Sequence, residues 1–229
     1  EKEWNKQQQQ QKPNNMITEH SNFSKINLVG NRKCTTFVAL RIIIITNMKF
    51  ETKAIHGVRN NDKGENWGST INMASTFPIK EYGAEQEFEY GRVSSPTRKD
   101  FETLIAKLEN GKHGFGFSSG MAATSSVFTM FKAGDHFIFG LDIYGGTYRI
   151  MHDIFNKFGF ESTFVDTTDL SQIEAAVRPN TKAIFVESPS NPLLDVTDIR
   201  GVVAIAKAHN LLTIVDNTFL SPVLQRPLE

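Results

Sequence analysis

From Asp100 to the end of the sequence, apolar residues alternate between helical spacing and short continuous runs. The spacing predicts a first helix over 101–108, which Gly111 ends. Four further helices are expected, over 121–131, 145–158 (ended by Gly159), 169–177 (capped by Asp169) and 197–209. Short, largely apolar runs lie between the helices, at 114–117, 136–139, 182–186 and 211–215, and a further strand is expected over 161–165. This alternation predicts an α/β fold in which a mostly parallel sheet is covered by helices on both faces.

The first hundred residues lack this alternation. Residues 1–47 contain a glutamine run and many Asn, Lys and Ser residues, which is typical of a disordered segment. Met48 is the natural start of the folded protein, so we interpret 1–47 as a disordered or misassigned extension. Residues 48–100 are polar and predict an extended N-terminal arm that lies on its own domain or on a partner subunit. Residues 101–229 would then form part of the α/β domain.

Composition narrows the class of protein. The formal net charge is zero, which gives no reason to expect nucleic acid or an anionic membrane as a partner. The apolar stretch 37–45 contains Arg41 and has about half of the ~20 residues that a membrane span needs. The basic, acid-poor start is also compatible with a mitochondrial leader, although no clear amphipathic helix is present. Cys34 is the single cysteine, which excludes an internal disulfide and fits a cytoplasmic setting.

Polar residues follow several of the apolar runs. In a parallel α/β sheet, ligands bind beyond the carboxyl ends of the strands. The candidate positions there are Gly120 and Met121, Tyr144, Glu187 and Asn191, and Asp216 and Thr218. We therefore expect the binding site along this edge of the sheet.

Each candidate also has a purely structural explanation. The Ser-Ser-Gly turn before Met121 suits a phosphate at a helix N-terminus, or is an ordinary helix cap. Asp216 ends a buried strand and needs either a positive partner or backbone N–H groups, and Glu187 is equally ambiguous. Tyr144 could stack on a cofactor ring or simply pack, and Asn191 could be a turn residue between two prolines.

Other site types have weaker support. Gly114, Gly116 and Gly120, with Asp142 downstream, resemble a dinucleotide-binding fingerprint, but the spacing is G-x-G-x-x-x-G. The histidines show no metal-ligand spacing, so we expect no metal site. No G-x-S-x-G sequence supports a hydrolase.

Five sequence motifs occur together in one order: Tyr-Gly-Arg followed by Ser-Pro-Thr-Arg, Ser-Gly-Met-Ala-Ala, Tyr-Gly-Gly-Thr-Tyr-Arg, Glu-Ser-Pro-Ser-Asn-Pro and Val-Asp-Asn-Thr-Phe. In this set the chain resembles the trans-sulfuration enzymes, namely cystathionine γ-synthase and the cystathionine γ- and β-lyases, from about Thr52 to Glu229. The resemblance implies a fold-type I pyridoxal 5'-phosphate (PLP) enzyme and an assembly of dimers into a homotetramer. It implies β- or γ-elimination, or γ-replacement, on cystathionine or an activated homoserine.

The resemblance also implies roles for the candidates. Tyr90 and Arg92 match a pair that reaches the cofactor phosphate of the neighbouring subunit, which would explain the arm. Gly120 and Met121 match the phosphate-binding turn. Tyr144 matches the tyrosine stacked on the pyridine ring, which is also considered for proton transfer.

Four more positions carry implied roles. Asp216 matches the carboxylate paired with the ring nitrogen, which keeps the ring able to accept electrons. Asn191 matches a residue near the ring hydroxyl and the substrate carboxylate. Glu187 and Thr218 match further pocket positions.

The sequence departs from the family pattern in three places. Ser95 stands where the family usually has Asn. Gly146 stands where methionine γ-lyases typically have Cys, which argues against that branch. The Schiff-base lysine, which the family carries in a Ser-x-Thr-Lys segment after the Asp-Asn-Thr strand, is absent. We therefore expect the chain to be a C-terminally truncated part of an enzyme and inactive alone. A non-catalytic fragment, an NAD-dependent dehydrogenase and another PLP enzyme of the same fold, such as an aminotransferase, remain as alternatives.

Overall fold

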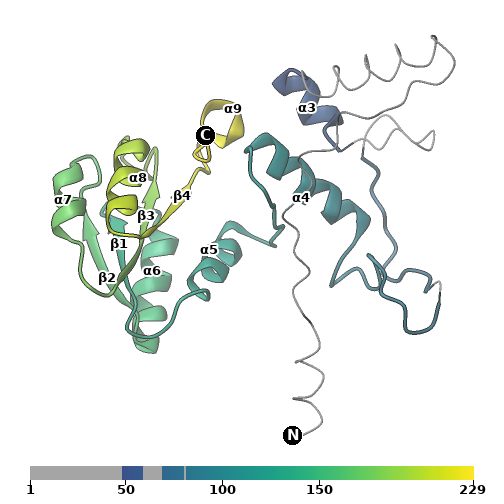
Figure 1. Ribbon diagram of the computed structural model, residues 1–229, viewed down its shortest axis with the longest axis horizontal. Coiled ribbons are helices and arrows are strands. Elements are labelled where there is room, and N and C mark those ends of the chain that lie inside the picture. The colour runs from purple at the N-terminus through teal and green to yellow at the C-terminus, as the bar shows by residue number, and fades with distance from the viewer. Residues whose placement is uncertain (1–47, 59–68, 80) are drawn as a thin grey trace, which may run out of the picture. The chain divides into compact units, whose positions relative to one another are not determined.

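The described part of the chain contains one parallel sheet with its helices. The computed structural model describes residues 48–58, 69–79 and 81–229, so the expected extension 1–47 lies outside it. The strands are β1 (His136–Gly140), β2 (Glu161–Val165), β3 (Thr181–Glu187) and β4 (Leu212–Asp216). The helices are α3 (Phe50–His56), α4 (Pro96–Leu108), α5 (Gly120–Phe128), α6 (Gly145–Asp153), η2 (Phe155–Phe158), α7 (Leu170–Ala175), α8 (Ile199–Ala208) and α9 (Ser221–Leu224) (Figure 1).

The four strands pair in the order β2-β1-β3-β4, and every pair is parallel. Each crossover contains a helix, as parallel pairing requires. The predicted α/β class is therefore confirmed. The chain leaves β1 toward β2 and leaves β3 toward β4, so the connections diverge between β1 and β3. In sheets of this kind, that point of divergence is where a ligand crevice forms.

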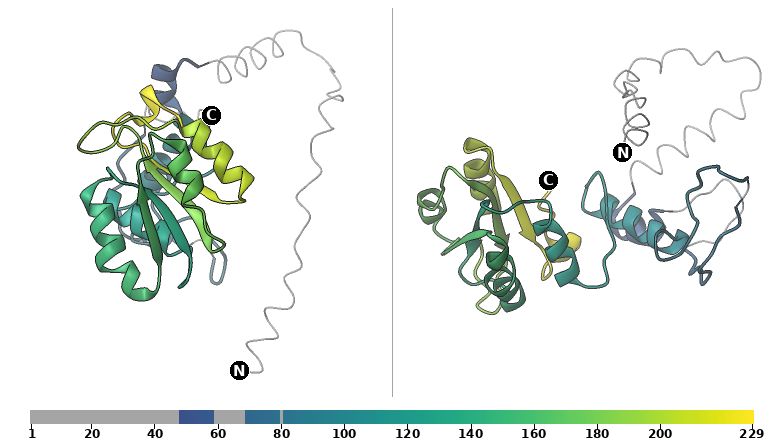
Figure 2. Two further views of the ribbon diagram at one scale, coloured as in Figure 1. Left: turned by 90° about the vertical axis from the view of Figure 1, so that its left-hand side faces the viewer. Right: turned by 90° about the horizontal axis from the view of Figure 1, so that it is seen from below.

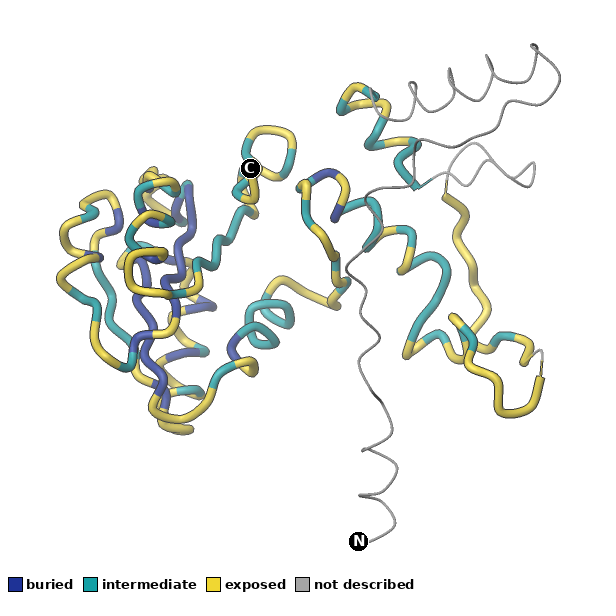
Figure 3. The backbone as a smooth tube through the Cα atoms, in the orientation of Figure 1, coloured by how far each residue is buried: buried dark blue, intermediate teal, exposed yellow. Residues whose placement is uncertain are grey.

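Two apolar clusters hold helices to the two faces of the sheet. One face packs Phe137 and Phe139 of β1 and Phe185 of β3 against Phe128 of α5 and Met151 of α6. The other face packs residues of α7 and α8 against alternate residues of β1 and β3, namely Ile173, Val202, Ala206, Ile138, Ile184 and Val186. Figure 2 (left) shows the sheet with the yellow-green α8 on one side and a teal helix on the other. The central strands β1 and β3 are almost wholly buried (Figure 3), because both of their faces are covered.

Side-chain caps set the starts of several helices. Asp169 accepts a hydrogen bond from the Ser171 N–H at α7, which confirms the predicted cap. Asp198 caps α8 through the Gly201 N–H at 3.1 Å. Each cap satisfies an N–H group that the helix itself leaves unpaired.

The structure corrects four expectations. The run 114–117 forms no strand, and the helix expected over 145–158 stops at Asp153 and resumes as η2. Gly159 ends η2 in the left-handed region, with φ 84°. The polar arm contains a short helix, α3, that was not predicted, and α4 starts before residue 100. None of the helices in the described residues is long and apolar enough to span a membrane.

Candidate cofactor site

Two carboxylates lie side by side at the carboxyl ends of β3 and β4. Glu187 and Asp216 are register partners in the β3–β4 pair. Alternation along each strand places both on the sheet face that also packs α5 and α6. The structure therefore brings together two residues that the sequence only placed at separate strand ends.

Glu187 connects this pair to the loop after β1. Its Oε2 accepts a hydrogen bond from the backbone N–H of Tyr144 at 2.6 Å. Glu187 is 6% exposed, and burial raises the pKa of its carboxyl group. The Tyr144 N–H opposes this rise, whereas the negative charges of Asp216 and Asp142 add to it. Glu187 thus anchors the Tyr144 backbone, a role that its sequence position did not reveal.

The Tyr144 ring and the Met121 side chain meet over Gly146. A Cβ atom on Gly146 would lie 2.4 Å from Tyr144 Cε1 and 2.9 Å from Met121 Sδ. Gly146 therefore leaves room for both side chains, and the first turn of α5 lies beside the aromatic ring. Tyr144 is 42% exposed, which leaves it accessible to a ligand.

The N-terminus of α5 has the properties of an anion site. Ser119 Oγ caps the Ala122 N–H at 3.1 Å, which leaves the N–H groups of Gly120 and Met121 without an acceptor in the described residues. A Cβ on Gly120 would meet nothing within 4 Å. Free amide donors, a positive helix end and open space together suit a phosphate.

Asp216 is held by Thr218 through one of its two oxygens. The Thr218 N–H and the Thr218 hydroxyl both donate to Oδ1, at 3.0 Å and 2.5 Å. Within the described residues, Oδ2 has no hydrogen-bond partner, so it can accept a proton donor from a ligand. Thr218 therefore orients the carboxylate.

The turn after β3 is held by Ser188 and Ser190, for which the sequence suggested no individual role. Ser188 Oγ accepts the Thr197 N–H at 3.1 Å, and Ser190 donates to Asp142 Oδ2 from the loop after β1. Asn191 follows, half-buried, and none of the described residues makes a hydrogen bond to its side chain. Asp142, which the sequence offered as a ribose-binding acid, instead ties the loops after β1 and β3 together.

Tyr90 and Arg92 lie in the arm. The Arg92 guanidinium lies 4.9 Å from the centroid of the Tyr90 ring, and both side chains are exposed. No hydrogen bond, ion pair or ring contact among the described residues joins them to the sheet edge. The structure therefore does not bring these two predicted residues to the rest of the site.

The glycine pair at 114 and 116 does not form a dinucleotide-binding turn. No strand precedes Gly114, and a Cβ there would lie 2.2 Å from the backbone oxygen of Glu102 in α4. The Gly116 N–H donates to Glu102 Oε1 at 2.8 Å. These glycines allow the chain to approach α4 closely, which removes the structural basis of the NAD alternative.

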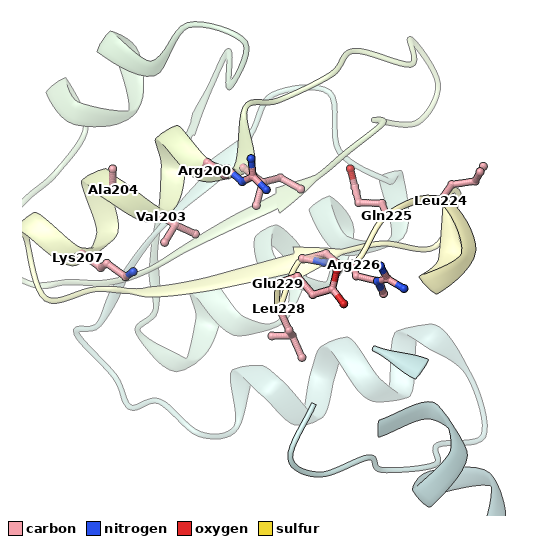
Figure 4. Close-up of a pocket in the computed structure, with 11 residues that line it drawn as sticks. Arg200, Val203, Ala204, Lys207, Leu224, Gln225, Arg226, Leu228 and Glu229 are labelled. Carbon is pink, nitrogen blue, oxygen red and sulfur yellow. Dashed lines mark ion pairs between the residues drawn. The ribbon is translucent and has the colours of Figure 1, made fainter. Parts of the chain in front are cut away.

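A separate pocket of about 780 Å³ lies between α8 and residues 224–229. Figure 4 shows Arg200, Val203 and Lys207 along α8, opposite Leu228. None of the predicted site residues lines it. It is therefore distinct from the site at the strand ends.

Comparison with known proteins defines the class. A parallel α/β domain with free amides at a helix N-terminus, a partly exposed aromatic ring and a strand-end carboxylate has the groups that a phosphate-bearing cofactor needs. Residues 51–229 match the model of the Cys/Met metabolism PLP-dependent enzyme family, and the chain belongs to this family.

Similar proteins agree with this assignment. The chain is 46% identical over 182 residues to the cystathionine γ-lyase of Bacillus subtilis (79% of this chain, 48% of the relative). It is 45% identical over 174 residues to the cystathionine γ-synthase of Haemophilus influenzae (76% and 47%). The structure of cystathionine γ-lyase from Lactobacillus plantarum complexed with L-serine superposes with a TM-score of 0.75 at 50% identity (79% and 48%). The chain thus spans about half the length of these relatives.

The family implies PLP as the cofactor, and the residues present fit it. The α5 amides suit its phosphate, Tyr144 offers a ring face, and Asp216 Oδ2 is available to a protonated ring nitrogen. Gly146 leaves room for Met121 of α5 beside the Tyr144 ring, and Glu187 binds the Tyr144 N–H and lies next to Asp216 in the sheet.

Proposed function

We propose that this chain is the cofactor-binding part of a PLP-dependent trans-sulfuration enzyme. The reaction would be β- or γ-elimination, or γ-replacement, on cystathionine or an activated homoserine. The observation that carries the proposal is Asp216 Oδ2, which has no hydrogen-bond partner among the described residues and lies on the sheet face that also packs α5 and α6. The names of the similar proteins, which include lyases and a synthase, support the reaction class.

Each residue would act on the cofactor or substrate in a defined way. Bound PLP supplies an electron-accepting ring for carbanions at the substrate Cα. Asp216 would hold the ring nitrogen protonated, because a carboxylate beside it favours the charged form. The amides of Gly120 and Met121 would bind the phosphate, Tyr144 would cover one face of the ring and take part in proton transfer, and Thr218 would orient Asp216.

Three further residues would complete the site. Asn191 would lie near the ring hydroxyl and the substrate carboxylate. Tyr90 and Arg92 would bind the cofactor phosphate of a neighbouring subunit, so the active unit would be a dimer, assembled further into a homotetramer in the cytoplasm. Their exposed position in the arm is compatible with a contact outside the chain.

Turnover requires a lysine that these 229 residues do not supply after the last strand. The sequence beyond Asp216 contains no lysine. We propose that the chain by itself binds PLP without a covalent bond and does not turn over substrate.

The test is equilibrium dialysis of the full chain against PLP, and separately against NAD. We expect PLP binding that Asp216→Asn weakens by about 10- to 100-fold, as the loss of a charge-assisted hydrogen bond would. Asp153→Asn, an exposed aspartate at the end of α6, is the matched control and should leave binding unchanged. Binding of NAD rather than PLP, or an equal effect of both variants, would refute the proposal. Substantial cystathionine turnover by this chain would refute its inactivity.

A further inference from the structure

We propose that Arg98 and Glu102 of α4 form a positioning pair that fastens two phosphate-binding segments to one helix. One segment carries Tyr90 and Arg92, and the other leads through Gly116 into Gly120. This inference rests on the proposed function, because it assumes that the Gly120 segment binds the chain's own cofactor phosphate and the Tyr90 segment binds that of a neighbouring subunit.

Arg98 holds the arm segment through its backbone. Its guanidinium donates to the carbonyl oxygen of Arg92 at 3.4 Å and to that of Val93. The same segment is folded tightly, since the Val93 and Ser94 N–H groups both donate to the Tyr90 carbonyl. Arg98 therefore fixes a turn that already contains both phosphate-binding side chains.

Glu102 holds the second segment. Its Oε1 accepts the Gly116 N–H at 2.8 Å and lies 3.4 Å from Arg98 Nε. The two glycines permit this approach: a Cβ on Gly116 would lie 3.3 Å from Arg98 Cγ, and one on Gly114 would lie 2.2 Å from the Glu102 backbone oxygen. Gly116 is four residues before Gly120 in the sequence.

The pair is better suited to positioning than to stabilising the fold. Its side chains are 36% and 22% exposed, and ion pairs at such sites usually add little to stability. The pair differs from an ordinary surface ion pair in its backbone contacts. Arg98 binds carbonyl oxygens of the segment that carries Arg92, and Glu102 binds the Gly116 N–H. Arginine suits this role because its planar fork offers several donors in fixed directions.

The experiment compares the affinity of the full chain for PLP with its affinity for pyridoxal, which lacks the phosphate. Equilibrium dialysis is run on wild type, Arg98→Gln, Glu102→Gln, the double variant and Arg98→Lys, each checked for native circular dichroism. Arg178→Gln is the matched control, because Arg178 forms an exposed ion pair with Glu161 at the same 3.4 Å distance.

We expect wild type to prefer PLP over pyridoxal, and Arg98→Gln and Glu102→Gln each to lower that preference about tenfold. Pyridoxal affinity should change less than twofold, and the double variant should lose little more than either single variant, because the residues act as one unit. Arg98→Lys keeps the positive charge but lacks the planar guanidinium, so it should lose most of the preference for PLP over pyridoxal. This variant tests the positioning role of Arg98 if Arg98→Gln does not fold.

The alternative outcomes are distinct. Wild type with no preference for PLP would overturn the proposed function and this inference with it. Wild type with the preference, and Arg98 or Glu102 variants that retain it or lose PLP and pyridoxal affinity equally, would overturn the positioning pair alone.

Discussion

His136 should make the stability of the fold depend on pH. The residue begins β1, is fully buried, and places its ring nitrogens 2.8 Å from Thr181 Oγ1 and 2.9 Å from Thr163 Oγ1. A neutral imidazole matches these hydroxyls by donating from one nitrogen and accepting at the other. Burial, followed by the positive charge of Arg178, lowers the pKa of His136 from 6.5 to about 4, against an opposing effect of Glu161.

The direction and size of the effect follow from this pKa. Between pH 6.5 and 4 the unfolded chain binds a proton at His136 that the folded chain does not, so acid favours unfolding. The contribution of neutral His136 to the free energy of unfolding is therefore fully present above pH 6.5, and it is lost as the pH falls from 6.5 through about 4. Each pH unit in this window is worth about 1.4 kcal/mol, so the total loss is about 3 kcal/mol. That is a large share of the ~5–15 kcal/mol by which typical domains are stable.

The assay is urea unfolding from pH 4 to pH 7.5, followed by circular dichroism, for wild type and His136→Gln. Glutamine retains a donor and an acceptor but does not titrate, so the difference between the two unfolding free energies isolates His136. We expect this difference to fall by about 3 kcal/mol from pH 6.5 to pH 4. A difference that stays constant with pH would refute the reasoning.

Two further predictions concern the site and the core. Burial raises the pKa of Glu187, so this carboxyl group should lower the free energy of unfolding as the pH rises from 4.5 through that raised value. In urea unfolding, Glu187→Gln should therefore become more stable relative to wild type across this range. A difference between the two proteins that does not change with pH would contradict the assignment. Phe128 is fully buried among the rings of Phe137, Phe139, Phe155 and Phe185. Phe128→Ala should therefore lower the free energy of unfolding by about 3–5 kcal/mol. A loss below about 1 kcal/mol would show that this cluster is not a packed core.

The spacing of apolar and polar residues along the chain was enough to predict the α/β class, the four strands and most helices. Near-continuous apolar runs such as 182–186 predicted buried strands because a strand covered on both faces has little contact with water. Asp169 was recognisable as a cap because the bond that it forms lies within its own helix turn. The strand-end residues could be predicted as candidates because parallel strands direct their carboxyl ends to one edge.

Predictions from the local sequence were wrong where contacts between distant segments decide the conformation. Gly114 and Gly116 resembled part of a nucleotide-binding turn, yet their conformation is set by Glu102 in another element. The break after Asp153 interrupts a helix that spacing alone predicted to continue.

The sequence by itself determined which residues are candidates for binding the cofactor, because residue type and position after a strand are local properties. Only the tertiary structure decided how they meet. It set the strand order β2-β1-β3-β4 and paired Glu187 with Asp216, and it turned Glu187 toward the Tyr144 N–H. The physical reason is that strand neighbours are chosen by packing between segments tens of residues apart, and the period of a single strand contains no information about its partner.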